Sequence, residues 1–245
     1  MRAQEADNLG RQIADLVRGG DPGRGFALLM PVLAERTKFL MLDRIGKAVG
    51  AGQLPSTNAF LEQIAAQRTM GGWVVIASAL GAQMERDLEG ALSRCHSFVV
   101  QANVWHGADI LGERVPGPAL RAAFQPTLEL LSPWREDANR WVRRTVGVAV
   151  HFWAKRSRGA PELQAKAQAL LAFLEPMFGE WEIAAVKGVG WGLKTLGRHF
   201  PDLVADWLAK QVVDQKRRHR ALMLRKALKY LSSEHRARAI GSGGR

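Results

Sequence analysis

The placement of proline most limits how this chain can fold. Seven of its ten prolines stand at the edges of long segments with helical periodicity, where proline can start or stop a helix: Pro22, Pro55, Pro116, Pro118, Pro133, Pro161 and Pro201. Alanine and leucine supply 35 and 29 of the 245 residues, whereas threonine supplies six and tyrosine one. Because this composition favours helix over strand, the chain is predicted to be all-α.

The segments between these breaks predict a series of helices of ordinary length. They cover residues 3–18, 24–35, 38–49, 56–68, 71–84, 87–102, 104–113, 117–131, 136–155, 161–177, 181–198, 201–215 and 218–231. One helix is expected to begin with Ser56 or Thr57 as its cap and Glu62 behind it. Another is expected to begin at Pro201-Asp202, with an acidic residue in its first turn.

Short connections and the lack of a strand pattern indicate paired helices stacked as a curved solenoid. Four segments recur about one HEAT-like repeat apart, roughly 40–47 residues: Trp105–Asp109, Trp141–Arg144, Lys187–Trp191 and Arg225–Lys229. The prediction is therefore a single domain of HEAT-like repeats over residues 1–240 with a basic concave face, followed by a flexible tail at 241–245. An irregular helical bundle is the alternative.

Several protein classes are excluded by composition. A single cysteine, Cys95, excludes a disulfide scaffold and a multi-cysteine zinc module. No apolar run approaches the roughly 18 residues of a membrane span, and residues 1–25 are too charged for a signal peptide. The chain is therefore expected to be a soluble, cytoplasmic protein without a bound metal.

The net charge of +12 lies entirely in the second half of the chain. Residues 1–120 hold 12 basic and 12 acidic side chains, and residues 121–245 hold 23 and 11. Residues 210–238 alone carry a net charge of +8, with leucines interleaved as in a folded segment. This asymmetry indicates a polyanion bound on one side of the molecule, with nucleic acid favoured over an anionic membrane.

Basic residues and an indole share one face of each of two predicted helices. In the helix at 136–155 this face holds Arg140, Arg144, His151, Lys155 and Arg158, with Trp141 beside it. In the helix at 181–198 it holds Lys187, Trp191, Lys194 and Arg198. Lysine and arginine neutralise phosphates, and an aromatic face can accept a sugar, a base or a cation. Both faces therefore predict contact with nucleic acid.

Trp105 and Asp109 are four residues apart, so they project side by side from one helix. One interpretation of Asp109 is an ordinary surface carboxylate. The other is an acid that stabilises a developing positive charge or orients a water, which suits cleavage of a glycosidic bond. No second carboxylate pairs with it in the sequence, so a two-carboxylate sugar hydrolase is not indicated.

Other motifs are interpreted as structural. The glycine-rich run Gly188–Gly192 follows no predicted strand and lacks the spacing of a phosphate loop. A helix-hairpin-helix turn is an alternative, but close packing of helices around Trp191 is preferred. Cys95 and the scattered histidines fit neither a metal site nor an activated thiol, and Trp73 is predicted to be buried near the start of a helix.

Taken together, the four recurring segments resemble the bacterial DNA alkylation repair family. The residues that carry the resemblance are Trp105-x-x-x-Asp109, Trp141-Val142-Arg143-Arg144-Thr145, the run Lys187–Lys194 and the run Arg225–Leu231. The similarity is to the HEAT-like 3-methyladenine and 7-alkylguanine DNA glycosylases of the alkylpurine glycosylase D type. It spans about 105–231, roughly half of the chain.

This resemblance implies a solenoid that holds duplex DNA on its concave basic face. It implies that Asp109 assists hydrolysis of the N-glycosidic bond, that Trp105 and Trp191 pack on the deoxyribose, and that Arg144 holds a backbone phosphate. It also implies that the lesion can stay stacked, without an enclosed base pocket. An N3- or N7-alkylated purine is already a cationic leaving group, so no general acid, metal or nicotinamide is needed.

The sequence therefore predicts a monomeric, monofunctional glycosylase, nucleoid-associated in use, with double-stranded DNA carrying alkylated purines as its partner and no cofactor. Besides Arg144, the residues expected to bind DNA are Arg140, His151, Lys155, Lys187, Lys194, Arg198, Arg225 and Lys229. The alternative function is a non-catalytic basic repeat module that binds damaged or branched DNA, or a protein partner.

Overall fold

The computed structural model describes residues 1–241, in which every regular element is helical. The chain divides into two compact units, Met1–Val115 and Pro116–Arg245. In a repeat array each repeat contacts only its neighbours, so two compact units can still belong to one array. The single domain over 1–240 therefore stays a prediction. Apart from Gly241, the predicted tail lies outside the described residues.

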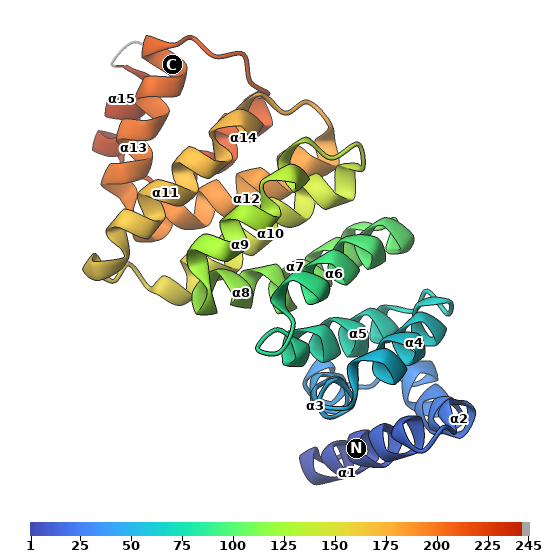
Figure 1. Ribbon diagram of the computed structural model, residues 1–245. Helices are drawn as coiled ribbons and strands as arrows, with labels where there is room; N and C mark the ends of the chain where they lie inside the picture. The colour runs from blue at the N-terminus through green and yellow to red at the C-terminus, as the bar shows by residue number, and fades with distance from the viewer. Residues whose placement is uncertain (242–245) are drawn as a thin grey trace. The chain divides into compact units, whose positions relative to one another are not determined.

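The first unit contains seven helices within its described residues, packed in two layers (Figure 1). They are α1 (Ala3–Arg18), α2 (Pro22–Ala34), α3 (Phe39–Gly50), α4 (Leu54–Ala65), α5 (Met70–Gln83), α6 (Leu88–Ala102) and α7 (Trp105–Arg114). In one layer α1 packs on α3, α3 on α5, and α5 on α7. In the second layer α2 contacts α4, and α4 contacts α6.

The second unit repeats this alternation (Figure 1). Its helices are α8 (Pro116–Ala122), α9 (Phe124–Leu131), α10 (Arg140–Ser157), α11 (Gln164–Leu174), α12 (Ile183–His199), α13 (Pro201–Ala209), α14 (Ala221–Ala227) and α15 (Ser233–Ile240). One layer is α8, α10, α12 and α14 in that order, and the other includes α11, α13 and α15. Short helical turns connect them at Pro133–Glu136, Pro161–Leu163, Glu175–Gly179 and Lys210–Asp214.

The predicted helices agree with the structure except at a few boundaries. The segment 117–131 is two helices, because Ala123 leaves the helical conformation and Pro126 in the next turn cannot donate to the turn before it. The segment 218–231 shortens to α14. The sequence analysis missed α15, which Ser232 caps by accepting a hydrogen bond from the His235 amide at 3.2 Å.

The predicted cap at Ser56 or Thr57 is wrong. Helix α4 begins earlier, at Leu54, because Pro55 fits the first turn without an amide hydrogen. The hydroxyl of Thr57 is buried and donates instead to the Val49 carbonyl at 3.4 Å. The predicted start of α13 at Pro201, with Asp202 in the first turn, is confirmed.

Glycines allow α10 and α12 to approach closely. A side chain on Gly147 of α10 would collide with the backbone of Gly188, and one on Gly192 would come within 2.8 Å of the Gly147 carbonyl. The run Gly188–Gly192 lies inside α12, so the phosphate loop and the helix-hairpin-helix turn are both excluded. Close helix packing, the preferred interpretation, is confirmed.

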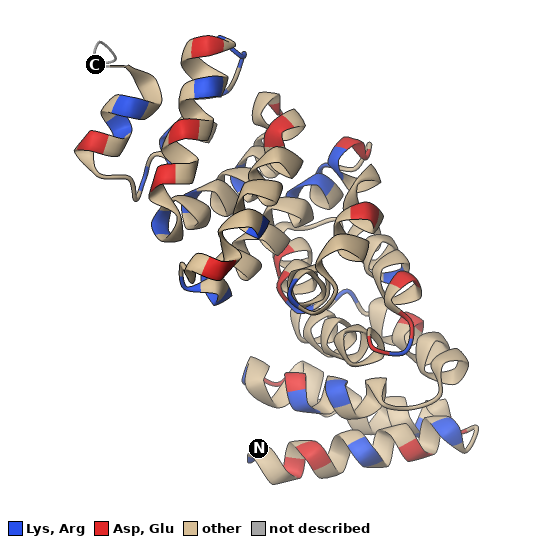
Figure 2. Cartoon of the chain, turned by 60° about the vertical axis from the view of Figure 1, so that its left-hand side comes forward, with Lys and Arg blue, Asp and Glu red and all other residues tan. Residues whose placement is uncertain are grey.

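Charge is distributed evenly in the helix that opens the chain. In Figure 2 both acidic and basic residues lie along α1, and Asp15 and Arg18 on this helix form an ion pair at 2.6 Å. Among residues 1–241, no helix is long and apolar enough to cross a bilayer.

Candidate nucleic-acid interface

The indole of Trp191, half-buried on α12, rests on the imidazole of His151 from α10. The two rings stack with their centroids 3.9 Å apart and an angle of 22° between their planes. Only 7% of the surface of His151 is exposed, so the histidine lies beneath the indole. Its predicted contact with DNA stays a prediction, whereas its contact with Trp191 is a feature of the structure.

The hydroxyl group of Thr195 links His151 of α10 to the backbone of α12. Thr195 donates its hydroxyl hydrogen to the Trp191 carbonyl at 3.0 Å, one turn earlier on α12. The Thr195 oxygen lies 2.7 Å from Nδ1 of His151. Since Thr195 has one hydroxyl hydrogen for these two bonds, we assign Nδ1–H of His151 as the donor in the second.

His151 stays neutral at physiological pH. Its pKa is lowered to about 4, first by burial and then by the positive charges of Lys155 and Lys194. The ring therefore gives Trp191 an uncharged aromatic surface among cations. This arrangement leaves the positive charge of the surrounding surface to lysine and arginine.

The guanidinium of Arg144 is positioned by the start of α12. Its Nη1 donates to the Ala184 carbonyl at 3.2 Å, and only 8% of the residue is exposed. The side chain crosses Gly188, where an added Cβ would lie 2.7 Å from Cγ of Arg144. Helix α12 therefore determines where this predicted phosphate ligand lies.

The neighbouring Arg143 has a structural role. Its Nε contacts Oε2 of Glu180 at 2.6 Å, and its Nη1 donates to the Asp137 carbonyl at 2.6 Å. Burial alone would raise the pKa of Glu180, but Arg143 and the amides of Trp181 and Glu182 hold it below its ordinary value. Arg143 thus ties the start of α10 to the segment that precedes α12.

The remaining predicted DNA-binding residues of the second unit belong to three neighbouring helices of one layer. Arg140 and Lys155 come from α10, Lys187, Lys194 and Arg198 from α12, and Arg225 and Lys229 from α14 and the turn after it. All are exposed except Lys194, which is half-buried. The cationic groups of Lys194 and Arg198 lie 5.4 and 5.3 Å from the ring centroid of Tyr230. Cations therefore gather on α10, α12 and α14.

One cation among these helices was missed by the sequence analysis. Lys226 on α14 is half-buried, and its side chain passes over Gly190 of α12. Its position within the segment Arg225–Lys229 was visible in the sequence. Its burial against a glycine 36 residues earlier was not, because no local pattern records such a contact.

In the first unit, Trp105 and Asp109 lie one turn apart on α7, as predicted. Trp105 opens the helix with 56% of its surface exposed, and Asp109 is half-buried. The His106 ring meets the Trp105 ring edge-on, with centroids 5.6 Å apart. Burial lowers the pKa of His106, and the carboxylate of Asp109 acts in the opposite direction. The indole is therefore accessible to a ligand beside a carboxylate.

A polar network holds α7 to the two helices that precede it in its layer. Arg114 at the end of α7 contacts Asp43 of α3, with Nε 2.7 Å from Oδ1. Ser78 of α5 donates to the same oxygen at 2.7 Å. Asp43 is thus engaged in holding three helices together, and this network supports the helix that carries Trp105 and Asp109.

The remaining candidate residues have structural positions. Cys95 is fully buried, and burial raises the pKa of its thiol, so it is a poor nucleophile. Trp73 is 1% exposed, which confirms its predicted burial. Within the part of the chain that the structure describes, no group of three or more His, Cys, Asp or Glu side chains could hold a metal ion.

Comparison with known protein families gives one finding. The family described as DNA alkylation repair enzyme matches residues 56–231, which is more than half of the chain and includes all four recurring segments. No curated protein and no solved structure matches the sequence significantly.

Proposed function

Because the chain belongs to the DNA alkylation repair enzyme family, we propose that it is a monofunctional DNA glycosylase that removes cationic N3- and N7-alkylated purines from duplex DNA. The observation that most supports this function is the platform of Trp191 on His151, with cations of α10, α12 and α14 around it. The cations neutralise backbone phosphates. The indole offers a flat face to a sugar that becomes positive in the transition state.

The chemistry needs little besides electrostatic stabilisation. The N-glycosidic bond breaks and its electron pair goes to the alkylated purine, which leaves as a neutral base. Water then adds to the anomeric carbon of the deoxyribose and releases a proton. We assign to Asp109 the stabilisation of the oxocarbenium-like transition state and the orientation of this water. Trp105 and Trp191 pack on the deoxyribose in this assignment, and Arg144 holds a phosphate.

The architecture and partners follow from the same proposal. The alternation of two helix layers within each unit supports HEAT-like repeats, and we assign the duplex to the basic face of a curved solenoid. The protein acts as a monomer on DNA in the bacterial nucleoid, and it uses neither metal nor cofactor.

The decisive experiment measures base release from methylated duplex DNA by chromatography of the free bases. Replacing Asp109 by Asn is expected to lower the rate of release at least about tenfold, which corresponds to about 1.4 kcal/mol in the barrier. Affinity for the duplex should stay close to that of the wild type, because Asn keeps the size of the side chain and Asp109 contacts no phosphate in this proposal.

The matched control is Glu62→Gln, which removes an exposed carboxylate on α4 of the same unit and should change neither quantity. An equal loss of affinity and rate in Asp109→Asn would contradict the catalytic assignment. Folded wild-type protein that binds the duplex but releases neither 3-methyladenine nor 7-methylguanine would refute the glycosylase.

The second candidate is a basic helical module that binds damaged or branched DNA, or a protein partner, without chemistry. The observation in its favour is that the family match begins at residue 56, which leaves α1, α2 and α3 outside it. Binding of duplex DNA without any base release, in both wild type and Asp109→Asn, is the result that this alternative predicts.

A further inference from the structure

Lys226 lies where its positive charge destabilises the folded protein. It is half-buried on α14, and its aliphatic stem passes over Gly190 of α12. A Cβ added to Gly190 would lie 2.6 Å from Cδ of Lys226 and 3.0 Å from its Cβ. The absence of a side chain at position 190 therefore gives the lysine its place between the two helices.

Within residues 1–241, the charged groups that shift the pKa of this ammonium are cations. Burial lowers the pKa of Lys226, and Lys194, Arg144, Lys187 and Lys229 lower it further in that order. Arg144 belongs to α10, Lys187 and Lys194 belong to α12, and Lys229 lies in the turn after α14. Helix α14 packs on α12, which in turn packs on α10. Among the described residues, none of the four lysines forms an ion pair with a carboxylate.

A half-buried ammonium among like charges destabilises the folded protein, since neither burial nor repulsion is offset by an acid. A lysine can usually turn its charged end toward water along its flexible stem. Here the stem is seated on Gly190, and the ammonium stays among the other cations. Functional sites are where such unfavourable arrangements concentrate, because the ligand supplies the missing charge.

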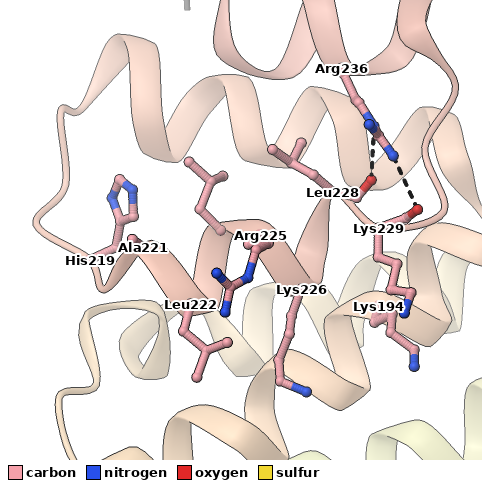
Figure 3. A pocket seen from close by; sticks show the side chains of 10 residues that line it. Lys194, His219, Ala221, Leu222, Arg225, Lys226, Leu228, Lys229 and Arg236 are labelled. Carbon is pink, nitrogen blue, oxygen red and sulfur yellow. Dashed lines mark hydrogen bonds between the residues drawn. The ribbon is translucent and has the colours of Figure 1, made fainter. Parts of the chain in front are cut away.

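Three of these lysines, Lys194, Lys226 and Lys229, border a pocket of about 810 Å³ in the second unit, whose lining residues are shown in Figure 3. Lys194, Arg225, Lys226 and Lys229 contribute positive groups, and leucines of α14 contribute apolar surface. Arg236 of α15 donates to the carbonyls of Leu228 and Lys229, both at 3.2 Å, and so braces the turn that carries Lys229. The pocket thus joins a cationic rim to an apolar wall, as a phosphate with its attached sugar requires.

We propose that Lys226 is the central ligand of a phosphodiester-binding site on α14, at which Lys194 and Lys229 close around a backbone phosphate of duplex DNA. The identity of the ligand, duplex DNA, rests on the proposed function. The site does not depend on the glycosylase chemistry. Duplex DNA is favoured over a free phosphate because the exposed cations continue along α12 and α10, where successive phosphates of one strand can follow.

The first test is the binding of an undamaged, fluorescein-labelled duplex, measured by anisotropy over a range of salt concentrations. Lys226→Met keeps the stem and removes the charge. It is expected to weaken binding about five- to tenfold and to make the slope of log K against log salt shallower by about one unit. The melting temperature of the variant should rise, because the repulsion among the cations is relieved.

Two further variants separate the position of the charge from its presence. Gly190→Ala keeps all charges but places a methyl group against the Lys226 stem, so it should weaken binding with the net charge unchanged. Lys210→Met removes an exposed lysine next to α13, in the other layer, and should leave both affinity and slope close to wild type.

Proton linkage provides a readout that a structural role would not change. A bound phosphate restores the charged form of Lys226, so binding takes up a proton below the ordinary lysine pKa of about 10.4. Wild-type affinity should therefore fall as the pH rises toward that ordinary value, and Lys226→Met should lose this dependence. Lys226→Arg, which stays charged at these pH values, should bind well and also lack it.

Three results would overturn the site: unchanged affinity and slope in Lys226→Met, equal losses in Lys210→Met, or saturable binding of inorganic phosphate with no effect of Lys226→Met on the duplex. Vesicles with anionic headgroups that compete fully with DNA would also contradict it. Because no assay here measures base release, the site can fail while the glycosylase stands, and the glycosylase can fail while the site stands.

Discussion

At the scale of single residues, the roles of neighbouring charges depend on what each side chain packs against. Arg143 and Arg144 are adjacent in the sequence, yet Arg143 is paired with Glu180 whereas Arg144 lies across Gly188. His151 shares a helical face with Lys155 but is buried under Trp191, where burial keeps it neutral. The indole therefore rests on a ring that does not add to the surrounding positive charge.

The buried His151 predicts an acid-dependent loss of stability. Its pKa is lowered to about 4 in the folded protein, so the unfolded chain binds the proton first as pH falls below about 6.5. Stability from this residue is complete above that pH and is lost toward pH 4, by about 3 kcal/mol in total. Urea unfolding of wild type and His151→Phe from pH 7 to pH 4 measures the difference.

His151→Phe cannot be protonated but keeps an aromatic ring beneath Trp191. The variant therefore removes the titrating group without removing the stacked ring. At neutral pH it should release alkylated bases at a rate near that of the wild type. Parallel stability curves for the two proteins across this pH range would show that His151 is not held neutral.

At the scale of elements, α10 and α12 of the second unit approach most closely where both helices have glycine, so their backbones are in direct contact. Gly147 on α10 faces Gly188 on α12, and the Arg144 stem crosses the same glycine. Dense packing of this kind tolerates little added volume. The glycines therefore determine both the distance between the helices and the position of Arg144.

Gly188→Ala is expected to destabilise the protein by about 1–3 kcal/mol, because its methyl group would meet Cα of Arg144 at 2.9 Å and its Cγ at 2.7 Å. DNA affinity should fall as well, since Arg144 has to move. Gly23→Ala on α2 is the matched control, with no atom within 4 Å of an added Cβ, and should be neutral or slightly stabilising. Equal urea midpoints for the two variants would refute the close packing.

At the scale of the whole molecule, the charge of +12 belongs to one half of the chain. In the first unit carboxylates balance the basic side chains and engage them, as Asp43 does with Arg114. In the second unit, exposed cations gather on α10, α12 and α14. Binding of a polyanion should therefore depend strongly on salt, because each neutralised phosphate releases counterions.

Arg144→Ala tests this electrostatic picture in the intact chain. Duplex affinity should fall, and the slope of log K against log salt should become shallower by about one unit. The measurement is anisotropy of a labelled duplex at several salt concentrations. Arg143→Ala is the adjacent control: it should lower stability by removing the Glu180 pair, and it should leave the slope unchanged. An unchanged slope in Arg144→Ala would contradict a phosphate contact.

The sequence by itself determined the helical class, most helix positions, the charge asymmetry and the resemblance that the family match supports. These properties depend on local periodicity, composition and short motifs, which are readable along the chain. It could not show where α15 begins beyond the shortened α14, nor that α4 begins before Ser56, because helix ends depend on competing local caps.

Only the tertiary structure decided which members of a polar helical face are buried. His151 meets Thr195 from 44 residues away, and Lys226 lies over Gly190 of another helix. Burial, repulsion and pKa depend on such distant neighbours, because charges interact through space and not along the chain. The helical faces with basic residues were visible in the sequence. The neutral His151 ring under Trp191 and the position of Lys226 among other cations depend on how α10, α12 and α14 pack.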